Sequence, residues 1–126
     1  MASRIQNTCF DSADPYPLAE FWSQVLGIPV DAECEPGDDE VGFELGHDQY
    51  LLFLRVPEPK TVKNRMHLCL EPQQSRDAEV ERVLGLGATM VADHRNPDGT
   101  GWAVLADPEG NELCVLRSAA ERAATS

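Results

Sequence analysis

Apolar side chains recur along the chain at two spacings, and the two spacings follow one another twice. Residues 5–11 alternate weakly between apolar and polar, which is typical of a strand with one exposed face. Residues 14–27 carry apolar side chains at intervals of three and four, which is typical of a helix with one buried face. Residues 66–70 and 77–87 repeat this order. The pattern therefore predicts two copies of a strand followed by a helix.

Residues at the ends of the first helical pattern support its limits. Asp14 is a favoured N-cap residue, and Pro15 suits the first turn because its missing N–H would have no partner there. Gly27 marks the end of this helix, and Gly87 marks the end of the second. Trp22 lies in the apolar stripe, so we expect it in the core.

Each predicted helix is followed by three short apolar segments. These are residues 28–32, 41–45 and 50–56 in the first half, and residues 89–93, 101–106 and 112–117 in the second. In the second half, the turn sequences NPDGTG and DPEGN separate these three segments from one another. Each half therefore predicts strand, helix and three strands, and the tail from residue 118 predicts a short helix or a frayed end.

The two halves superimpose at a fixed offset of sixty residues. Gly27 falls on Gly87, Cys9 falls on Cys69, and Leu45 falls on Leu105. Similar residues at the same offset indicate an internal repeat of one structural module.

Length and composition limit the class of protein. A chain of 126 residues with 42% hydrophobic and 25% charged residues suits one compact domain. No apolar run approaches the roughly 18 residues that span a bilayer, and no signal-peptide pattern opens the chain, so we expect a cytoplasmic protein without a membrane partner. A net charge of −12 repels phosphate backbones and argues against nucleic acid as a partner.

Charged residues are unevenly distributed. Residues 31–40 are strongly acidic and predict a solvated loop, whereas Lys60, Lys63 and Arg65 form a basic stretch between the two halves. We expect these cations to pair with the acidic residues, within one chain or across the interface of a homodimer. The alternative is that they attract an anionic ligand.

Four cysteines have no CxxC spacing, so buried thiols are expected rather than disulfides. They are Cys9, Cys34, Cys69 and Cys114.

Three segments of the chain, in this order, carry a family resemblance: DPYPLAEFWSQVLG, VPEPKTVKNRMHLCL and DPEGNELCVL. The chain resembles the vicinal oxygen chelate superfamily (glyoxalase, bleomycin resistance protein and dioxygenase), in particular its small bacterial glyoxalase-like domains. The resemblance implies one α+β domain over residues 1–126, with two βαβββ modules in a pseudo-two-fold arrangement around an open β-cup. Module one would cover about residues 1–59 and module two about residues 60–118, followed by a short tail.

The resemblance also implies where a metal would bind. One ligand would lie on the opening strand and one on the closing strand of each module, at Asn7, Leu54, His67 and Cys114. Only His67 is a good donor for a hard divalent ion, so we expect no metal and no other cofactor. If a divalent metal does bind, His67 and Glu112 are the expected ligands, because Glu112 shares a strand face with Cys114.

His67 has three possible roles. It could be a histidine satisfied within the cup, a neutral imidazole that bonds a ligand, or a general base. Cys69 and Cys114 are expected to fill space, since no third group is visible that would orient His67 for a reactive thiol. Trp102, at the start of a cup strand, is a further candidate for ligand contact.

The function implied by the resemblance is binding of a small organic molecule in the cup without the usual divalent metal. Asn7, Leu54, His67, Trp102 and Cys114 would contact that molecule. One alternative is a lyase, isomerase or dioxygenase that is metal-dependent or based on His67, with Glu112 as a second catalytic group. Another is a regulatory module that uses the fold as a scaffold.

Overall fold

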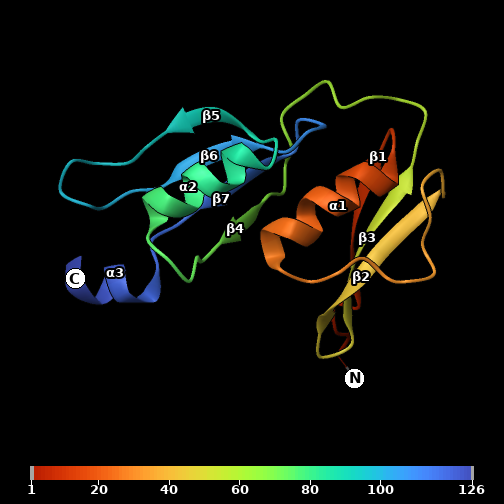
Figure 1. Cartoon of the computed structure of the whole chain (residues 1–126), viewed down its shortest axis with the longest axis horizontal. Coiled ribbons are helices and arrows are strands. Elements are labelled where there is room, and N and C mark those ends of the chain that lie inside the picture. The colour runs from red at the N-terminus through yellow and green to blue at the C-terminus, as the bar shows by residue number, and fades with distance from the viewer. Residues whose placement is uncertain (1, 126) are drawn as a thin grey trace. The chain divides into compact units, whose positions relative to one another are not determined.

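A computed structural model describes residues 2–125 and divides the chain into two compact units, with the boundary between Pro59 and Lys60. We refer to the part before this boundary as unit 1 and to the part after it as unit 2. Each unit contains one small sheet with a helix packed on one face of it (Figure 1). The predicted α+β class is confirmed.

Unit 1 contains one helix and a three-stranded sheet. Its elements are β1 (Asn7–Ser12), α1 (Pro15–Leu26), β2 (Glu40–Gly46) and β3 (Gln49–Arg55). The strand order is β1-β3-β2, in which β1 runs parallel to β3 and β2 antiparallel to it. The apolar stripe of α1 and one face of the sheet form the core, with these buried residues: Leu18, Phe21, Trp22, Val25, Val41, Phe43, Leu51 and Phe53.

The ends of α1 follow the sequence prediction. Pro15 occupies the first turn, and Gly27 takes the left-handed conformation, with φ of 72°, that a C-cap glycine adopts without steric cost. The Gly27 amide donates to the Ser23 carbonyl at 2.8 Å. Asp14 stands at the N-cap position, but its carboxylate pairs with Arg55 at 3.5 Å.

The strand predicted over residues 28–32 is wrong. Within the described residues this segment has no strand assignment, so unit 1 has one strand fewer than unit 2. Pro29 has no N–H to donate to a ladder, and the Asp31 amide makes a single ladder-like bond to the Gly42 carbonyl at 3.0 Å.

Unit 2 has the complete predicted order of strand, helix and three strands. Its elements are β4 (Leu68–Leu70), α2 (Arg76–Gly85), β5 (Thr89–Asp93), β6 (Ala103–Ala106), β7 (Glu112–Val115) and α3 (Ala119–Thr125). The strand order is β4-β7-β6-β5, with β4 parallel to β7 and the other pairs antiparallel. The core consists of Val80, Val83, Ala103, Leu105, Leu113 and Val115.

Strand register corrects the sixty-residue offset. Cys69 lies directly opposite Cys114 in unit 2, whereas Cys9 lies opposite Leu52 in unit 1. The offset from Cys9 to Cys69 is sixty residues, but the offset from Leu52 to Cys114 is sixty-two. The structural counterpart of Cys114 is therefore Leu52, and Leu54 lies two residues farther along the same face of β3.

The pairing of Leu45 with Leu105 fails for the same reason. Leu105 is fully buried, whereas 40% of Leu45 is exposed. Leu51 and Leu113 are equivalent, since they precede Leu52 and Cys114. Phe43 pairs with Leu51 and Leu105 pairs with Leu113, so the buried Phe43 is the structural counterpart of Leu105. The segment between the helix and the last two strands is two residues longer in unit 2.

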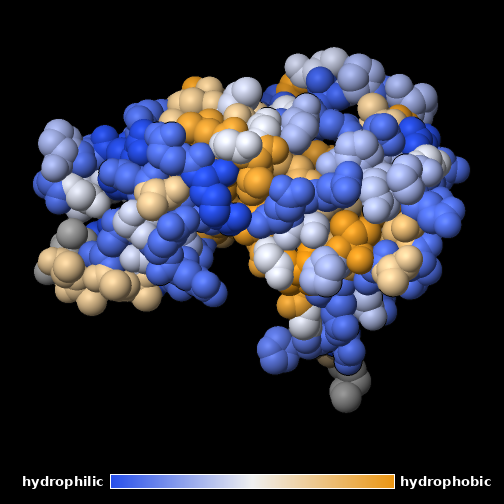
Figure 2. Space-filling view, in the orientation of Figure 1, coloured by the Kyte–Doolittle hydropathy of each residue, from blue (hydrophilic) through white to orange (hydrophobic). Residues whose placement is uncertain are grey.

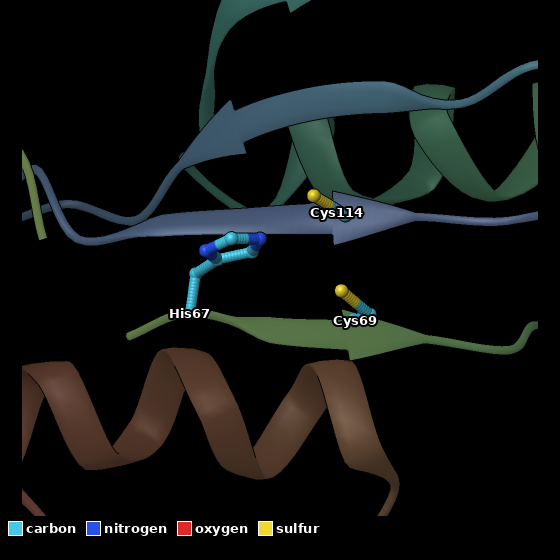
Figure 3. Close-up of side chains that lie close together, drawn as sticks. All are labelled: His67, Cys69 and Cys114. Atoms are coloured by element: carbon cyan, nitrogen blue, oxygen red, sulfur yellow. The ribbon is translucent and has the colours of Figure 1, made fainter. Parts of the chain in front are cut away.

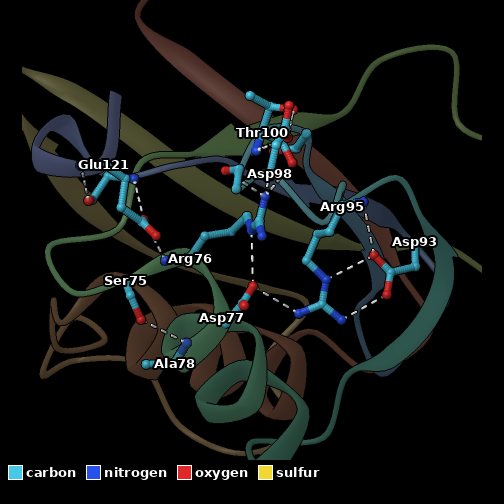
Figure 4. Close-up of polar contacts among 12 residues, drawn as sticks. Ser75, Arg76, Asp77, Ala78, Asp93, Arg95, Asp98, Thr100 and Glu121 are labelled. Carbon is cyan, nitrogen blue, oxygen red and sulfur yellow. Dashed lines mark hydrogen bonds and ion pairs between the residues drawn. The ribbon is translucent and has the colours of Figure 1, made fainter. Parts of the chain in front are cut away.

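A buried arginine fixes the loop between β5 and β6. Arg76 is only 4% exposed, and its Nη1 donates to the carbonyl oxygens of Thr100 at 2.8 Å and Gly101 at 3.1 Å (Figure 4). Its Nε donates to the Asp77 carboxylate at 3.0 Å. The NPDGTG turn, predicted from its composition alone, is thus held to the start of α2 by a charged side chain.

The start of α2 is capped from two directions. The Ser75 hydroxyl accepts from the Ala78 amide at 3.1 Å, so the helix begins one residue earlier than predicted. The Glu121 carboxylate of α3 accepts from the Arg76 amide at 2.7 Å. The tail from residue 118 therefore forms a short helix, one of the two structures predicted for it.

Within residues 2–125, no helix has the length and apolar character needed to cross a membrane.

Candidate functional site

The most chemically distinctive group of side chains lies on neighbouring strands of unit 2. His67, Cys69 and Cys114, here called the thiol–imidazole cluster, place their donor atoms within 4.8 Å of one another (Figure 3). His67 stands two residues before Cys69, so both project from the same side of the chain, and the parallel register sets Cys69 opposite Cys114. His67 and Cys69 are exposed, whereas Cys114 is buried.

The environments of the two thiols differ. Burial, together with the neighbouring Cys69, raises the pKa of the Cys114 thiol to about 11, although Lys63 acts in the opposite direction. Cys114 is therefore protonated at neutral pH when no cation is bound. The prediction of buried cysteines is correct for Cys114 and wrong for Cys9 and Cys69, which are exposed.

Glu112 is engaged by the segment that precedes β4. Its carboxylate accepts from Lys60 Nζ at 3.2 Å and from the Asn64 amide at 3.1 Å. Burial opposes ionisation of Glu112, but the hydrogen bonds from Asn64 and Lys60 outweigh it and lower the pKa of the carboxyl. An ionised carboxylate with these partners is poorly suited to donate a proton or to bind a divalent ion.

Within the chain, Lys60 does not pair with the acidic residues 31–40 as predicted. Lys60 forms its ion pair with Glu112 in unit 2. The acidic segment of unit 1 is instead held by Arg55, whose Nε donates to Asp39 at 2.9 Å. Asn64 adds a bond from its side chain to Asn111 at 3.0 Å, so the basic stretch is anchored to the turn before β7.

The predicted ligand-binding residues of unit 1 lie on neighbouring strands but are not adjacent. Asn7 is exposed on β1 opposite Tyr50, and Leu54 is half-buried on β3 opposite Asp11. Four residues of strand separate these two pairs, which corresponds to about 13 Å. By strand register, Tyr50 in unit 1 occupies the place of Glu112 in unit 2.

Trp102 lies at the end of the unit 2 sheet away from Glu112. Ala103, the next residue, pairs with Val115, whereas Glu112 pairs with Ala106 at the other end of β6. Trp102 is 43% exposed and packs on His94 with ring centroids 4.9 Å apart. The structure therefore brings His67 and Glu112 to one end of the sheet, leaves Trp102 at the other, and sets Cys114 between them.

The sequence did not show that Cys69 lies beside Cys114. The spacing of two from His67 to Cys69 already placed both side chains on one face. The missing information was the register between β4 and β7, which brings Cys114 opposite Cys69 from forty-five residues away.

Comparison with known proteins agrees with this fold. Residues 7–116 match the family model of the glyoxalase-like domain, whereas no curated protein matches the sequence. A glyoxalase/bleomycin resistance protein/dioxygenase family enzyme from Burkholderia phytofirmans is similar in structure, with a TM-score of 0.67 and 18% identity over 90% of this chain and 97% of that one.

Two further solved structures share the fold. A lactoylglutathione lyase from Agrobacterium tumefaciens has a TM-score of 0.61 and 21% identity, over 90% of this chain and 92% of that one. A fosfomycin resistance protein from Mesorhizobium loti has a TM-score of 0.66 and 18% identity, over 98% of this chain and 99% of that one. The match to the family model covers most of the chain, and the chain therefore belongs to the glyoxalase-like domain family of the vicinal oxygen chelate superfamily.

Proposed function

We propose that the protein binds a small organic molecule on the sheet faces that its helices leave uncovered, without the hard divalent ion usual in the superfamily. The observation that carries this proposal is the poor set of oxygen and nitrogen donors at the expected metal positions. Leu54, and Leu52 at the corrected position, offer no donor atom, and Asn7 offers only a neutral amide. Glu112, the carboxylate that could replace Cys114, is held by Lys60 and Asn64.

The uncovered faces have the mixed chemistry that small organic ligands require. In unit 1 the exposed side chains of Asn7 and Cys9 lie on the same face of the sheet as the half-buried Leu52 and Leu54. Apolar surface with a few polar groups is the usual composition of ligand-binding sites. The face drawn in Figure 2 is mainly hydrophilic, with apolar side chains gathered in several groups.

A thermal-shift screen tests this proposal. The panel should include fosfomycin, bleomycin and S-lactoylglutathione, because proteins of similar fold are named for these compounds. A ligand should raise the melting temperature in proportion to the logarithm of its concentration. The increase should be unchanged when Mg²⁺ or Mn²⁺ is added.

Two leucine variants locate the binding face. Leu54→Gln should weaken binding by about tenfold through loss of apolar contact. Leu45→Gln is the matched control, since Leu45 is an exposed leucine of the same sheet that lies five residues along β2 from Glu40, the partner of Leu54. Binding that requires Mn²⁺, or that both variants weaken equally, would contradict the proposal.

An enzymatic role is the second candidate, and the exposed imidazole of His67 favours it. Proton transfer by His67 would be consistent with a lyase or isomerase, and His67→Gln should then abolish turnover while leaving ligand binding intact.

We also propose a homodimer, which light scattering at micromolar concentration in low salt tests directly. Since Lys60 is paired within its own unit, Lys63 and Arg65 are the basic residues of this stretch that we assign to the interface.

A further inference from the structure

We propose that His67, Cys69 and Cys114 form a binding site for a thiophilic cation of the Zn²⁺ class, contained entirely in unit 2. Two of the three ligands, His67 and Cys114, stand at positions of the superfamily's hard-metal site, and the new elements are the third ligand, Cys69, and the preference for a soft cation that two thiolates confer. Cys69 does not correspond to any of the four superfamily positions, and all three donors come from one module.

The geometry requires little rearrangement. Zinc–sulfur bonds of about 2.3 Å and zinc–nitrogen bonds of about 2.0 Å, at tetrahedral angles, place donor atoms about 3.5–3.8 Å apart. The three donor atoms already lie within 4.8 Å of one another. Cys69 and Cys114 are fixed opposite each other by the parallel ladder, so small side-chain rotations complete the approach.

The donor types select the cation. Two thiolates with one imidazole are soft to borderline ligands, which favour Zn²⁺ and Cd²⁺ over Mg²⁺ or Mn²⁺. A bound divalent cation displaces both thiol protons, and two thiolates then neutralise its charge. A neutral centre of this kind tolerates the nearby Lys63, whose charge itself favours the Cys114 thiolate.

The site would be open on one side. Three protein donors leave one tetrahedral position, which is the arrangement of zinc sites that also bind water or an exogenous ligand. His67 and Cys69 are exposed, so this fourth position is accessible from solvent. A thiol, carboxylate or hydroxyl group of a small molecule is the class of ligand that would occupy it.

Metal binding to the full-length, reduced protein, purified without a metal-affinity tag, tests the proposal. After treatment with a chelator, the protein is titrated with Cd²⁺, and thiolate-to-metal charge-transfer absorption is followed in the ultraviolet. Zn²⁺ affinity is then measured by competition with a chromophoric chelator. We expect one equivalent of Cd²⁺ or Zn²⁺, unaffected by excess Mg²⁺.

Variants assign the ligands. Cys69→Ser should lower Zn²⁺ affinity by about 100-fold or more and reduce the charge-transfer absorption, since a lost ligand removes a large part of the binding free energy. Cys9→Ser is the matched control, because Cys9 is an exposed strand cysteine at the equivalent position of unit 1. His67→Gln provides a second test at an exposed position, with circular dichroism to confirm folding.

The proposal is overturned if the wild-type protein binds no stoichiometric Cd²⁺ or Zn²⁺. It is also overturned if Cys69→Ser binds Zn²⁺ as tightly as the wild type, or if Cys9→Ser loses affinity to the same extent. None of these measurements involves a small organic ligand, so the outcome is independent of the function proposed above.

Discussion

The buried Arg76 gives a quantitative test of how unit 2 is held together. In Arg76→Met the apolar stem remains, but the donors to Thr100 and Gly101 and the ion pair with Asp77 are lost. The two short bonds, at 2.8 and 3.1 Å, come from a charged donor that is 4% exposed. Hydrogen bonds to charged groups contribute about 1.5–3 kcal/mol each. The Asp77 pair adds little, because the carboxylate side chain is 67% exposed.

We therefore expect Arg76→Met to lower the free energy of unfolding by about 3–5 kcal/mol, out of a total of about 5–15 kcal/mol for a domain. Urea unfolding followed by circular dichroism measures this difference. Hydrogen exchange should also show faster exchange of the amides in the loop before Trp102, because that loop loses its anchor.

Arg95→Met is the control for this experiment. Arg95 pairs with Asp93 at 2.8 Å and with Asp77 at 3.1 Å, and both carboxylates are solvent-exposed. Its replacement should cost about 1 kcal/mol or less. If Arg76→Met destabilises the protein no more than Arg95→Met does, the reasoning from burial is refuted.

Two further predictions concern the cluster and its surroundings. Glu112→Gln should destabilise the protein by about 1 kcal/mol at pH 7 through the weakened contact with Lys60. Because the folded-state pKa of Glu112 is lowered, its contribution is complete above pH 4.5 and is lost as the pH falls further, so the difference between variant and wild type in urea unfolding should shrink there; a constant difference would contradict this. In metal-free protein, Cys69 should react with iodoacetamide at least about tenfold faster than Cys114, which is buried and whose pKa is raised to about 11. Peptide mapping by mass spectrometry measures both rates, and equal rates would show that the two thiols do not differ as described.

Local patterns were sufficient for the helices but not for every strand. The stripe of α1, Pro15 and Gly27 act through contacts within a few residues, and the structure agrees with them. The apolar segment at residues 28–32 looked like a strand, yet Pro29 removes a ladder donor and the segment is irregular. Propensity alone does not report whether a neighbouring strand is available to pair.

Non-local facts account for what the sequence missed at the candidate site. Alternation showed that His67 and Cys69 share a face, but not that Cys114 lies opposite them. The fixed offset hid a two-residue difference in loop length, because Leu45 and Leu105 are identical residues with different burial. Similarly, no local signal predicts that Lys60 reaches Glu112 across fifty-two residues.

The two-residue difference in register has a consequence for engineering the protein. Side chains alternate along a strand, so an even displacement preserves the face and changes only the position along the strand, by about 6.6 Å. A designer who copied the thiol–imidazole cluster into unit 1 at the sixty-residue offset would replace Leu54 with cysteine. That thiol would lie two residues along β3 from Leu52, the position that faces Cys9. At the true register, Cys9 already stands opposite Leu52. Asn7→His together with Leu52→Cys would therefore give unit 1 the same arrangement of one imidazole and two thiols, so the chain is two substitutions away from carrying that arrangement in both of its halves.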